Sequence, residues 1–228
     1  MAAALSDLTW PDAARGTASA VLAVPVGATE QHGPHLPLST DTDIAVALTD
    51  GLARARPHVV VAPAIAYGSS GEHAGFEGTV SIGQQAIELL LVELARSALA
   101  SFPRVLLVCA HGGNARPLRR AERRLRDERR NVRAWMPRWS GDAHAGRAET
   151  SLMLAIAPER VRLDRAAPGA TAPIDELMES LVAEGVRAVS ANGVLGHPGG
   201  ASAAEGRALL ATQIDRLTEA VDRWRREE

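Results

Sequence analysis

Histidines and carboxylates gather in a few short loops of this 228-residue sequence. Glu30 and His32 lie two residues apart, and Asp41 follows nine residues after His32. In an extended stretch, side chains two residues apart project to the same side, so Glu30 and His32 offer a carboxylate and an imidazole to one ion. Carboxylate and imidazole without thiolate suit zinc, iron(II) or manganese. The spacing therefore indicates a candidate metal centre.

Two further loops carry the same residue types. His111 begins the stretch His111-Gly112-Gly113-Asn114, and Asp142, His144 and Glu149 form another cluster. Each piece alone has an ordinary structural explanation: Glu-x-His can be a surface pair, a loop histidine often bonds to backbone, and Asp41 can cap a helix. Their coincidence on loops of an otherwise aliphatic chain favours one shared site, because binding groups concentrate on loops that a scaffold positions.

Short apolar runs alternate with amphipathic stretches in the segments between these loops. Aliphatic runs without polar alternation predict strands that are covered on both faces, and apolar positions near the 3.6-residue period predict helices. Strand alternating with helix predicts an α/β fold with a mostly parallel sheet, whose carboxyl edge gathers the loops. Asp41, Thr42 and Ser81 are expected to cap helices. The predicted strands are 20–26, 59–62, 105–110 and 132–136, and the predicted helices are 41–56, 84–100, 117–130, 149–157, 174–184 and 203–226.

The composition excludes several classes of protein. The 25 basic and 27 acidic residues nearly cancel, which argues against a nucleic-acid partner. Nine arginines between 116 and 133 are interleaved with acidic residues, a pattern typical of a solvated helix surface. The absence of lysine removes Schiff-base lysines and Walker-type phosphate loops. Cys109 is the only cysteine, so an intrachain disulfide and a thiolate zinc cage are excluded.

Length and hydropathy predict one domain that spans residues 1–228. An apolar content of 46% is enough to bury a sizeable core. The N-terminus lacks the pattern of a signal peptide, and no window reaches the roughly 18 apolar residues of a membrane span. We therefore expect a cytoplasmic protein without a membrane partner.

A long series of motifs resembles the creatininase (creatinine amidohydrolase) family. The resemblance covers nearly the whole chain in order, which makes it far more specific than any single motif. It implies a three-layer αβα fold, homo-oligomers, and metal-dependent hydrolysis of amide C–N bonds. The matching motifs are Val24-Pro25-Val26-Gly27-Ala28-Thr29-Glu30-Gln31-His32-Gly33-Pro34-His35-Leu36-Pro37-Leu38 with Asp41, Gly71-Glu72-His73, His111-Gly112-Gly113-Asn114, and His144-Ala145-Gly146-Arg147-Ala148-Glu149-Thr150-Ser151.

The resemblance also implies a set of metal ligands for two divalent first-row ions per subunit, zinc, iron(II) or manganese. Glu30 and His32 would each ligate one ion, Asp41 would bridge them, and His111 would complete the first shell. Creatininase has a ligating glutamate two residues after the histidine that matches His111, and this chain has Gly113 there. A carboxylate must then come from elsewhere, with Glu149 the best candidate, unless only one ion binds.

The expected mechanism uses water that a metal ion activates, since such an ion lowers the pKa of bound water to roughly 7. His144 is the candidate for delivering a proton to the amine leaving group, and Glu149 is a candidate catalytic residue as well as a ligand. His35 and His73 either orient ligands and substrate or are structural. His58 and His197 are expected to be structural or surface residues, and Cys109 a buried strand residue.

Within the family, the segments 62–68, 188–190, 193–196 and 203–207 most resemble the members associated with mycofactocin biosynthesis. The resemblance implies a peptidase that releases the modified C-terminal Val-Tyr dipeptide from a precursor peptide. Two alternatives stay open. One is a hydrolase of a small amide such as creatinine or a formamide, and the other is a catalytically silent metal-binding assembly protein, which the loss of a carboxylate at Gly113 favours.

Overall fold

The structure is a computed structural model that describes residues 3–139 and 141–227. Five strands form one sheet in the order β1-β3-β2-β4-β5, and each pair of neighbouring strands is parallel. The prediction of an α/β fold with a parallel sheet is confirmed. The strands are β1 (Ala3–Ala4), β2 (Val21–Val26), β3 (Val59–Val61), β4 (Arg104–Cys109) and β5 (Val132–Trp135).

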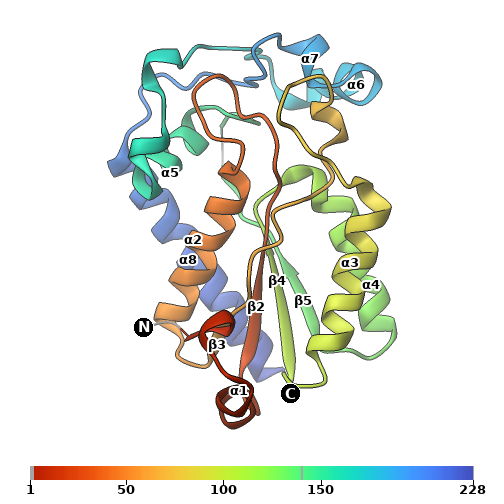
Figure 1. Cartoon of the computed structure of the whole chain (residues 1–228). Coiled ribbons are helices and arrows are strands. Elements are labelled where there is room, and N and C mark those ends of the chain that lie inside the picture. The colour runs from red at the N-terminus through yellow and green to blue at the C-terminus, as the bar shows by residue number, and fades with distance from the viewer. Residues whose placement is uncertain (1–2, 140, 228) are drawn as a thin grey trace.

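Helices cover both faces of the sheet and give the predicted αβα layers (Figure 1). On one face α2 (Thr40–Ala55), α5 (Arg147–Ile156) and α8 (Ala203–Arg226) pack together, and on the other α3 (Gly83–Ala98) packs against α4 (Ala115–Asp127). Within the described residues, no helix has the length and apolar character needed to cross a bilayer. The remaining helices are α1 (Trp10–Gly16), α6 (Ile174–Glu184), α7 (Val186–Val189) and the 3₁₀ turns Leu5–Asp7, Gly71–His73, Gly112–Asn114, Pro158–Arg160 and Leu163–Arg165.

The core consists of two aliphatic clusters, one on each face of the sheet. Along β2, Val21 and Ala23 join the cluster under α2, α5 and α8, while Leu22 and Val24 join the cluster under α3 and α4. Side chains alternate between the faces of a strand, so a strand that is covered on both sides needs apolar residues at every position. This requirement explains why the strand segments show no polar alternation.

The predicted elements differ from the structure mainly at their ends, by up to three residues. The capping predictions were wrong. Helix α2 begins at Thr40 after the cap residue Ser39, which puts Asp41 in its first turn, and Ile82 rather than Ser81 occupies the cap position of α3. The sequence patterns miss β1, α1 and α7, which are two, seven and four residues long and too short to show a clear period.

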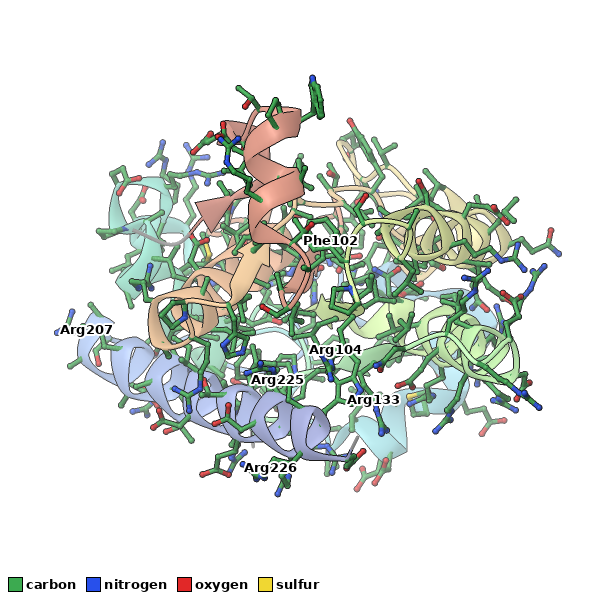
Figure 2. All side chains as sticks on the ribbon, turned by 90° about the horizontal axis from the view of Figure 1, so that it is seen from below. Phe102, Arg104, Arg133, Arg207, Arg225 and Arg226 are labelled. Carbon is green, nitrogen blue, oxygen red and sulfur yellow. The ribbon has the colours of Figure 1, made fainter. Side chains whose placement is uncertain are left out.

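The strand order reverses its direction between β2 and β4. From β2 the chain passes through α2 to β3 on one side, and from β4 it passes through α4 to β5 on the other. In open parallel sheets, ligands bind in the crevice outside the carboxyl ends of the strands at such a switch point. Helices α6 and α7 lie above this end (Figure 1), whereas the view from below shows Arg104, Arg133, Arg225 and Arg226 near the C-terminal end of α8 (Figure 2).

Candidate metal centre

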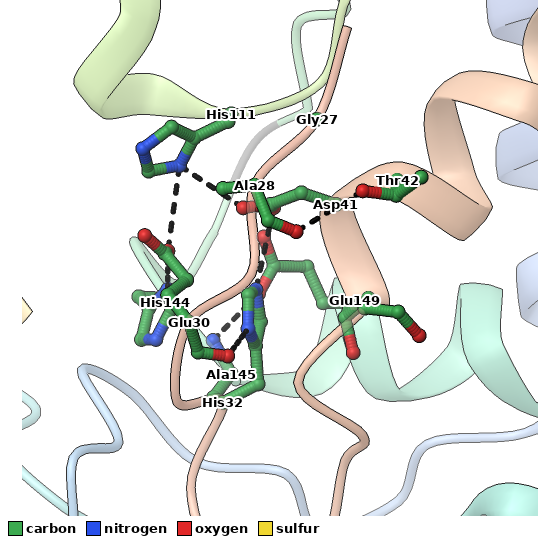
Figure 3. Close-up of polar contacts among 12 residues, drawn as sticks. Gly27, Ala28, Glu30, His32, Asp41, Thr42, His111, His144, Ala145 and Glu149 are labelled. Carbon is green, nitrogen blue, oxygen red and sulfur yellow. Dashed lines mark hydrogen bonds and ion pairs between the residues drawn. The ribbon is translucent and has the colours of Figure 1, made fainter. Parts of the chain in front are cut away.

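Side-chain hydrogen bonds hold the loops together at the carboxyl ends of β2 and β4. Asn114, which follows β4, accepts a hydrogen bond from the Ser69 amide at 2.9 Å and donates one to the Gly27 carbonyl at 3.0 Å. The Thr42 hydroxyl donates to the Ala28 carbonyl at 3.0 Å, and a Cβ at Gly27 would collide with Thr42. The first turn of α2, which carries Asp41, is therefore pressed against the loop that follows β2 (Figure 3).

Buried carboxylates and imidazoles meet at this point (Figure 3). The two carboxylate oxygens of Asp41 lie 3.3 Å from His32 Nε2 and 3.0 Å from His111 Nδ1. Glu30 Oε1 lies 3.4 Å from His111 Nδ1, and Glu149 Oε2 lies 3.9 Å from His32 Nε2. Asp41 thus faces both histidines, with Glu30 on the His111 side and Glu149 on the His32 side.

Hydrogen bonds to backbone carbonyls orient both imidazoles. His111 Nε2 lies 2.8 Å from the Ser69 carbonyl oxygen, and His32 Nδ1 lies 3.2 Å from that of Glu30. A carbonyl oxygen only accepts, so these nitrogens carry the ring protons. When these rings lose their second proton, the lone pairs of His111 Nδ1 and His32 Nε2 point toward the carboxylates, the arrangement that metal-ligating histidines commonly have.

Gln31 organises two further histidines. Its side-chain nitrogen donates to the Gly193 carbonyl at 3.1 Å and lies 2.7 Å from His73 Nδ1. If His73 Nδ1 accepts this bond, Nε2 of the neutral ring carries the proton and faces Glu30 Oε1 at 3.4 Å. His144 Nε2 lies 2.9 Å from the Gln31 carbonyl oxygen, which leaves His144 Nδ1 facing Glu30 Oε1 at 3.9 Å. This pattern fits His73 as a group that orients Glu30.

Glu149 is held by the backbone just before α5. The Ala145 amide donates to Glu149 Oε2 at 2.6 Å. Ala145 has a φ of 53°, in the left-handed region that non-glycine residues rarely adopt. Backbone strain of this kind concentrates at functional sites. Burial raises the pKa of Glu149 to about 7, against the opposing charge of His32.

Without a cation, the carboxylates of the cluster hold protons on two of its histidines. Burial disfavours the charged ring of His32, yet the negative charges of Asp41, Glu149 and Glu30 outweigh it and raise its pKa to about 10. For His111 burial acts in the same way, and Glu30 and Asp41 raise its pKa well above the usual value. Asp41 is also buried, but His32 and His111 hold its pKa well below the usual range. The carboxylates thus retain positive charge on both rings.

A divalent ion fits this donor set. Glu30 Oε2 is buried without a hydrogen-bond partner among the described residues, and His32 Nε2 and Asp41 Oδ2 have only the histidine–carboxylate contacts given above. Orphaned polar atoms of this kind are costly unless something else binds them. Ligand atoms of Glu30, Asp41 and His111 lie within 4.8 Å of one another. The same spacing holds for two other groups, His32 with His144 and Glu149, and Glu30 with His73 and His144.

The cluster forms the floor of a cavity of about 870 Å³. Its walls contain residues that the motifs did not single out for a function. Glu72 lies within the Gly71-Glu72-His73 motif, Arg116 lies in the first turn of the arginine-rich helix α4, and Met178 and Val182 lie on α6. The apolar periodicity of α6 is visible in the sequence, but only the fold shows that it lies beside the cavity.

Gly113 has no room for a side chain. A Cβ at this position would meet the Ser69 carbonyl, the carboxylate of Glu72 and the ring of His111. The glycine therefore lets Glu72 and His111 approach one another beside the cluster. Burial raises the pKa of Glu72 above its usual value.

The structure brings all six predicted site residues together: Glu30, His32, Asp41, His111, His144 and Glu149. His73 joins the cluster beside Glu30, and the three remaining histidines bond elsewhere. His35 Nε2 lies 2.9 Å from the Thr150 hydroxyl, His58 lies beside Arg225, and His197 accepts from the Gly199 amide. Cys109 is buried, as predicted, and burial raises the pKa of its thiol to about 11.

A comparison with family models decides the relationship. The model described as creatininase (creatinine amidohydrolase) matches residues 6–221. The chain belongs to the creatininase family. This membership confirms the resemblance, and with it the prediction of a metal-dependent amidohydrolase that acts on amide C–N bonds.

Two creatininase-family relatives carry the name mycofactocin precursor peptide peptidase. The protein from Mycobacterium ulcerans is 46% identical over 226 residues, which cover 95% of this chain and 86% of that protein. The protein from Mycolicibacterium smegmatis is 49% identical over 208 residues, which cover 88% and 84%.

Solved creatininase structures share the fold over nearly the whole chain. A crystal structure of creatinine amidohydrolase (creatininase) has a TM-score of 0.84 and 25% identity, covering 97% of both chains. A structure named creatininase Mn has a TM-score of 0.81 and 25% identity, covering 97% of this chain and 98% of that one. A creatininase variant named as the Zn-Zn type has a TM-score of 0.82 and 25% identity, covering 96% of both.

Proposed function

We propose that this protein is a metal-dependent peptidase that releases the modified C-terminal Val-Tyr dipeptide from the mycofactocin precursor peptide. The observation that carries the proposal is the buried floor of the cavity, where Glu30, Asp41 and Glu149 have histidines as their ion-pair partners among the described residues. The names of the two mycobacterial relatives support the peptide substrate.

Two first-row ions would be held by this floor. Glu30, Asp41 and His111 would hold one ion, and His32, Asp41 and Glu149 the other, so that Asp41 bridges them. Glu149 would then supply the carboxylate that Gly113 lacks. The creatininase structures named as Mn and Zn-Zn forms support ions of this class. Such ions act as Lewis acids on a carbonyl and lower the pKa of bound water.

His144 is proposed to move a proton during the reaction. Burial lowers its pKa to about 3, so the ring is neutral at rest. Its Nε2 is engaged by the Gln31 carbonyl, which leaves Nδ1 as the nitrogen that accepts a proton from the attacking water. The same nitrogen then donates this proton to the amine that leaves, since an amide nitrogen is a poor leaving group until it is protonated. Gln31 keeps the ring in this orientation.

The size of the cavity favours a peptide over a very small amide. Its volume of about 870 Å³ lies in the upper part of the usual range for ligand pockets, roughly 300–1,000 Å³. A peptide segment fills a space of this size, whereas creatinine leaves most of it to water. Hydrolysis of creatinine or a formamide is the second candidate, and the similarity to creatininase structures supports it.

Incubation with two substrates tests the proposal. The metal-loaded protein is incubated with the decarboxylated, modified precursor peptide and, separately, with creatinine, and the products are identified by mass spectrometry. We expect release of the dipeptide from the peptide and no turnover of creatinine. Turnover of creatinine alone would support the second candidate. Turnover of neither, with metal bound, would favour the metal-binding assembly protein. Homo-oligomerisation and a cytoplasmic setting stay predictions.

A further inference from the structure

The apolar side of α6 faces the cavity instead of the protein core. Ile174, Met178, Leu181 and Val182 follow the spacing of one helical face, and all four line the cavity. Helix α6 lies wholly within the described residues, and none of its side chains is buried. Met178 is 43% exposed and Val182 is 74% exposed.

Helix α8 shows how an amphipathic helix of this protein buries its apolar face. Its apolar side chains, such as Leu217 and Val221, are buried against α2 and α5. Helix α6 instead packs mainly against α7 and the turn Gly71–His73. Large apolar side chains that cluster beside a pocket commonly mark the place where a ligand binds.

Another part of the cavity lining has a different character. It is built from the beginnings of α3 and α4 and contains Ser81, Gln84 and Arg116. The polar part of the lining, the apolar face of α6 and the metal-binding cluster all belong to this one cavity. A peptide whose scissile amide lies over the floor therefore meets both an apolar surface and a polar, cationic surface.

We propose that the face of α6 formed by Ile174, Met178, Leu181 and Val182 binds the side chains of the two C-terminal residues of the substrate peptide. This face selects peptides that carry bulky apolar or aromatic side chains on the leaving side of the scissile amide. The inference rests on the proposed function, since it assigns the specificity of the same site. The polar remainder of the peptide lies toward Arg116.

Substitution of one wall residue tests the inference by binding as well as by turnover. Met178→Asp places a charge on the apolar face, and the matched control Leu89→Asp changes a side chain on α3 that is 54% exposed and lies outside the cavity lining. The probes are two fluorescently labelled peptides of equal length, the precursor peptide with its C-terminal Val-Tyr pair and a version that ends in Gly-Gly. Equilibrium dialysis gives Kd, and elemental analysis gives the metal content.

We expect Met178→Asp to weaken binding of the Val-Tyr peptide about tenfold, the amount that loss of a partly buried large apolar side chain predicts. Binding of the Gly-Gly peptide should change less than about twofold, and Leu89→Asp should change neither. Equal loss for both peptides, or no loss for the Val-Tyr peptide, would overturn the inference. If Met178→Asp fails to fold, Val182→Asp provides the same test at a more exposed position. Selective binding without cleavage by the native protein would refute the proposed function and leave the inference standing.

Discussion

The two ends of the parallel sheet both carry many charged groups, but these groups are exposed at one end and buried at the other. At the amino end, Arg133 pairs with Glu227 at 2.7 Å, with side chains that are 41% and 59% exposed (Figure 2). At the carboxyl end, the side chains of Glu30 and Asp41 are 1% and 3% exposed, and Glu30 Oε2 has no hydrogen-bond partner among the described residues (Figure 3).

The difference shows that burial, and not the number of charges, decides where chemistry occurs. Exposed ion pairs are screened by water and contribute about 0–1 kcal/mol each. Buried carboxylates have lost their hydration and must find another positive charge. Among the described residues, the ion-pair partners of these carboxylates are imidazoles, which are themselves common ligands of metal ions. Four experiments test this difference between the two ends of the sheet.

The largest effect is expected from His111→Ala at the carboxyl end. This substitution removes one proposed ligand, which lies beside Glu30 and Asp41. Loss of a group that only orients a ligand typically lowers metal affinity by roughly 10–100-fold. Loss of a ligand itself should lower it further. Turnover should fall in parallel with metal content. Elemental analysis of the purified variant measures the loss. His58→Ala, which removes a histidine at the amino end, is the control and should keep the native metal content.

His144→Ala is expected to separate metal binding from turnover. If His144 moves a proton and is not an essential ligand, the variant binds metal like the native protein and kcat falls by about 10²–10⁴-fold, the usual contribution of general acid–base catalysis. The measurement combines metal content with the rate of dipeptide release. A loss of metal in this variant would make His144 a ligand, and a native rate would remove it from the mechanism.

The stability of the metal-free protein should fall as the pH rises above neutral. Although burial opposes it, the carboxylates raise the pKa of His32 from 6.5 to about 10 in the folded state. A raised pKa gives stability that is fully present below pH 6.5 and is lost as the pH rises toward 10. Tm of the metal-free protein should therefore decrease between pH 7 and pH 9. Bound metal replaces the protons on the ligands and should abolish this decrease. A Tm that rises over the same range would contradict the charge balance described for the cluster.

The smallest effect is expected from Arg133→Ala at the amino end. The pair with Glu227 is exposed, so its loss should change the free energy of unfolding by no more than about 0.5 kcal/mol. Urea unfolding measures the change, with metal content as a second readout. A loss above about 1.5 kcal/mol would mean that the two ends differ less than their exposure suggests.

Much of the metal site could be predicted from the sequence because its residues lie in loops that directly follow strands. Glu30 follows β2 and His111 follows β4, and the carboxyl ends of adjacent parallel strands necessarily lie close together. Asp41 was found by its motif, although its position in the first turn of α2 was mistaken for a cap. The arginines of α4 form exposed pairs such as that of Arg120 with Glu88, in agreement with a solvated surface.

The walls of the cavity could not be predicted in the same way. The amphipathic pattern of α6 gave its correct bounds, but periodicity does not reveal what an apolar face contacts. The roles of Gln31 and Gly113 likewise depend on contacts with His144, His73 and Glu72, which are distant in sequence. Local patterns predict elements, whereas these contacts arise only when the loops meet.

The central claim is that the buried floor binds two cations, and anomalous diffraction from crystals of the metal-loaded protein tests it most directly. Data collected at the absorption edges of manganese, iron and zinc should give two peaks per chain. One peak should touch Glu30 and His111, the other His32 and Glu149, and both should touch Asp41. Peaks only outside this cluster, or none in protein with full activity, would contradict the account.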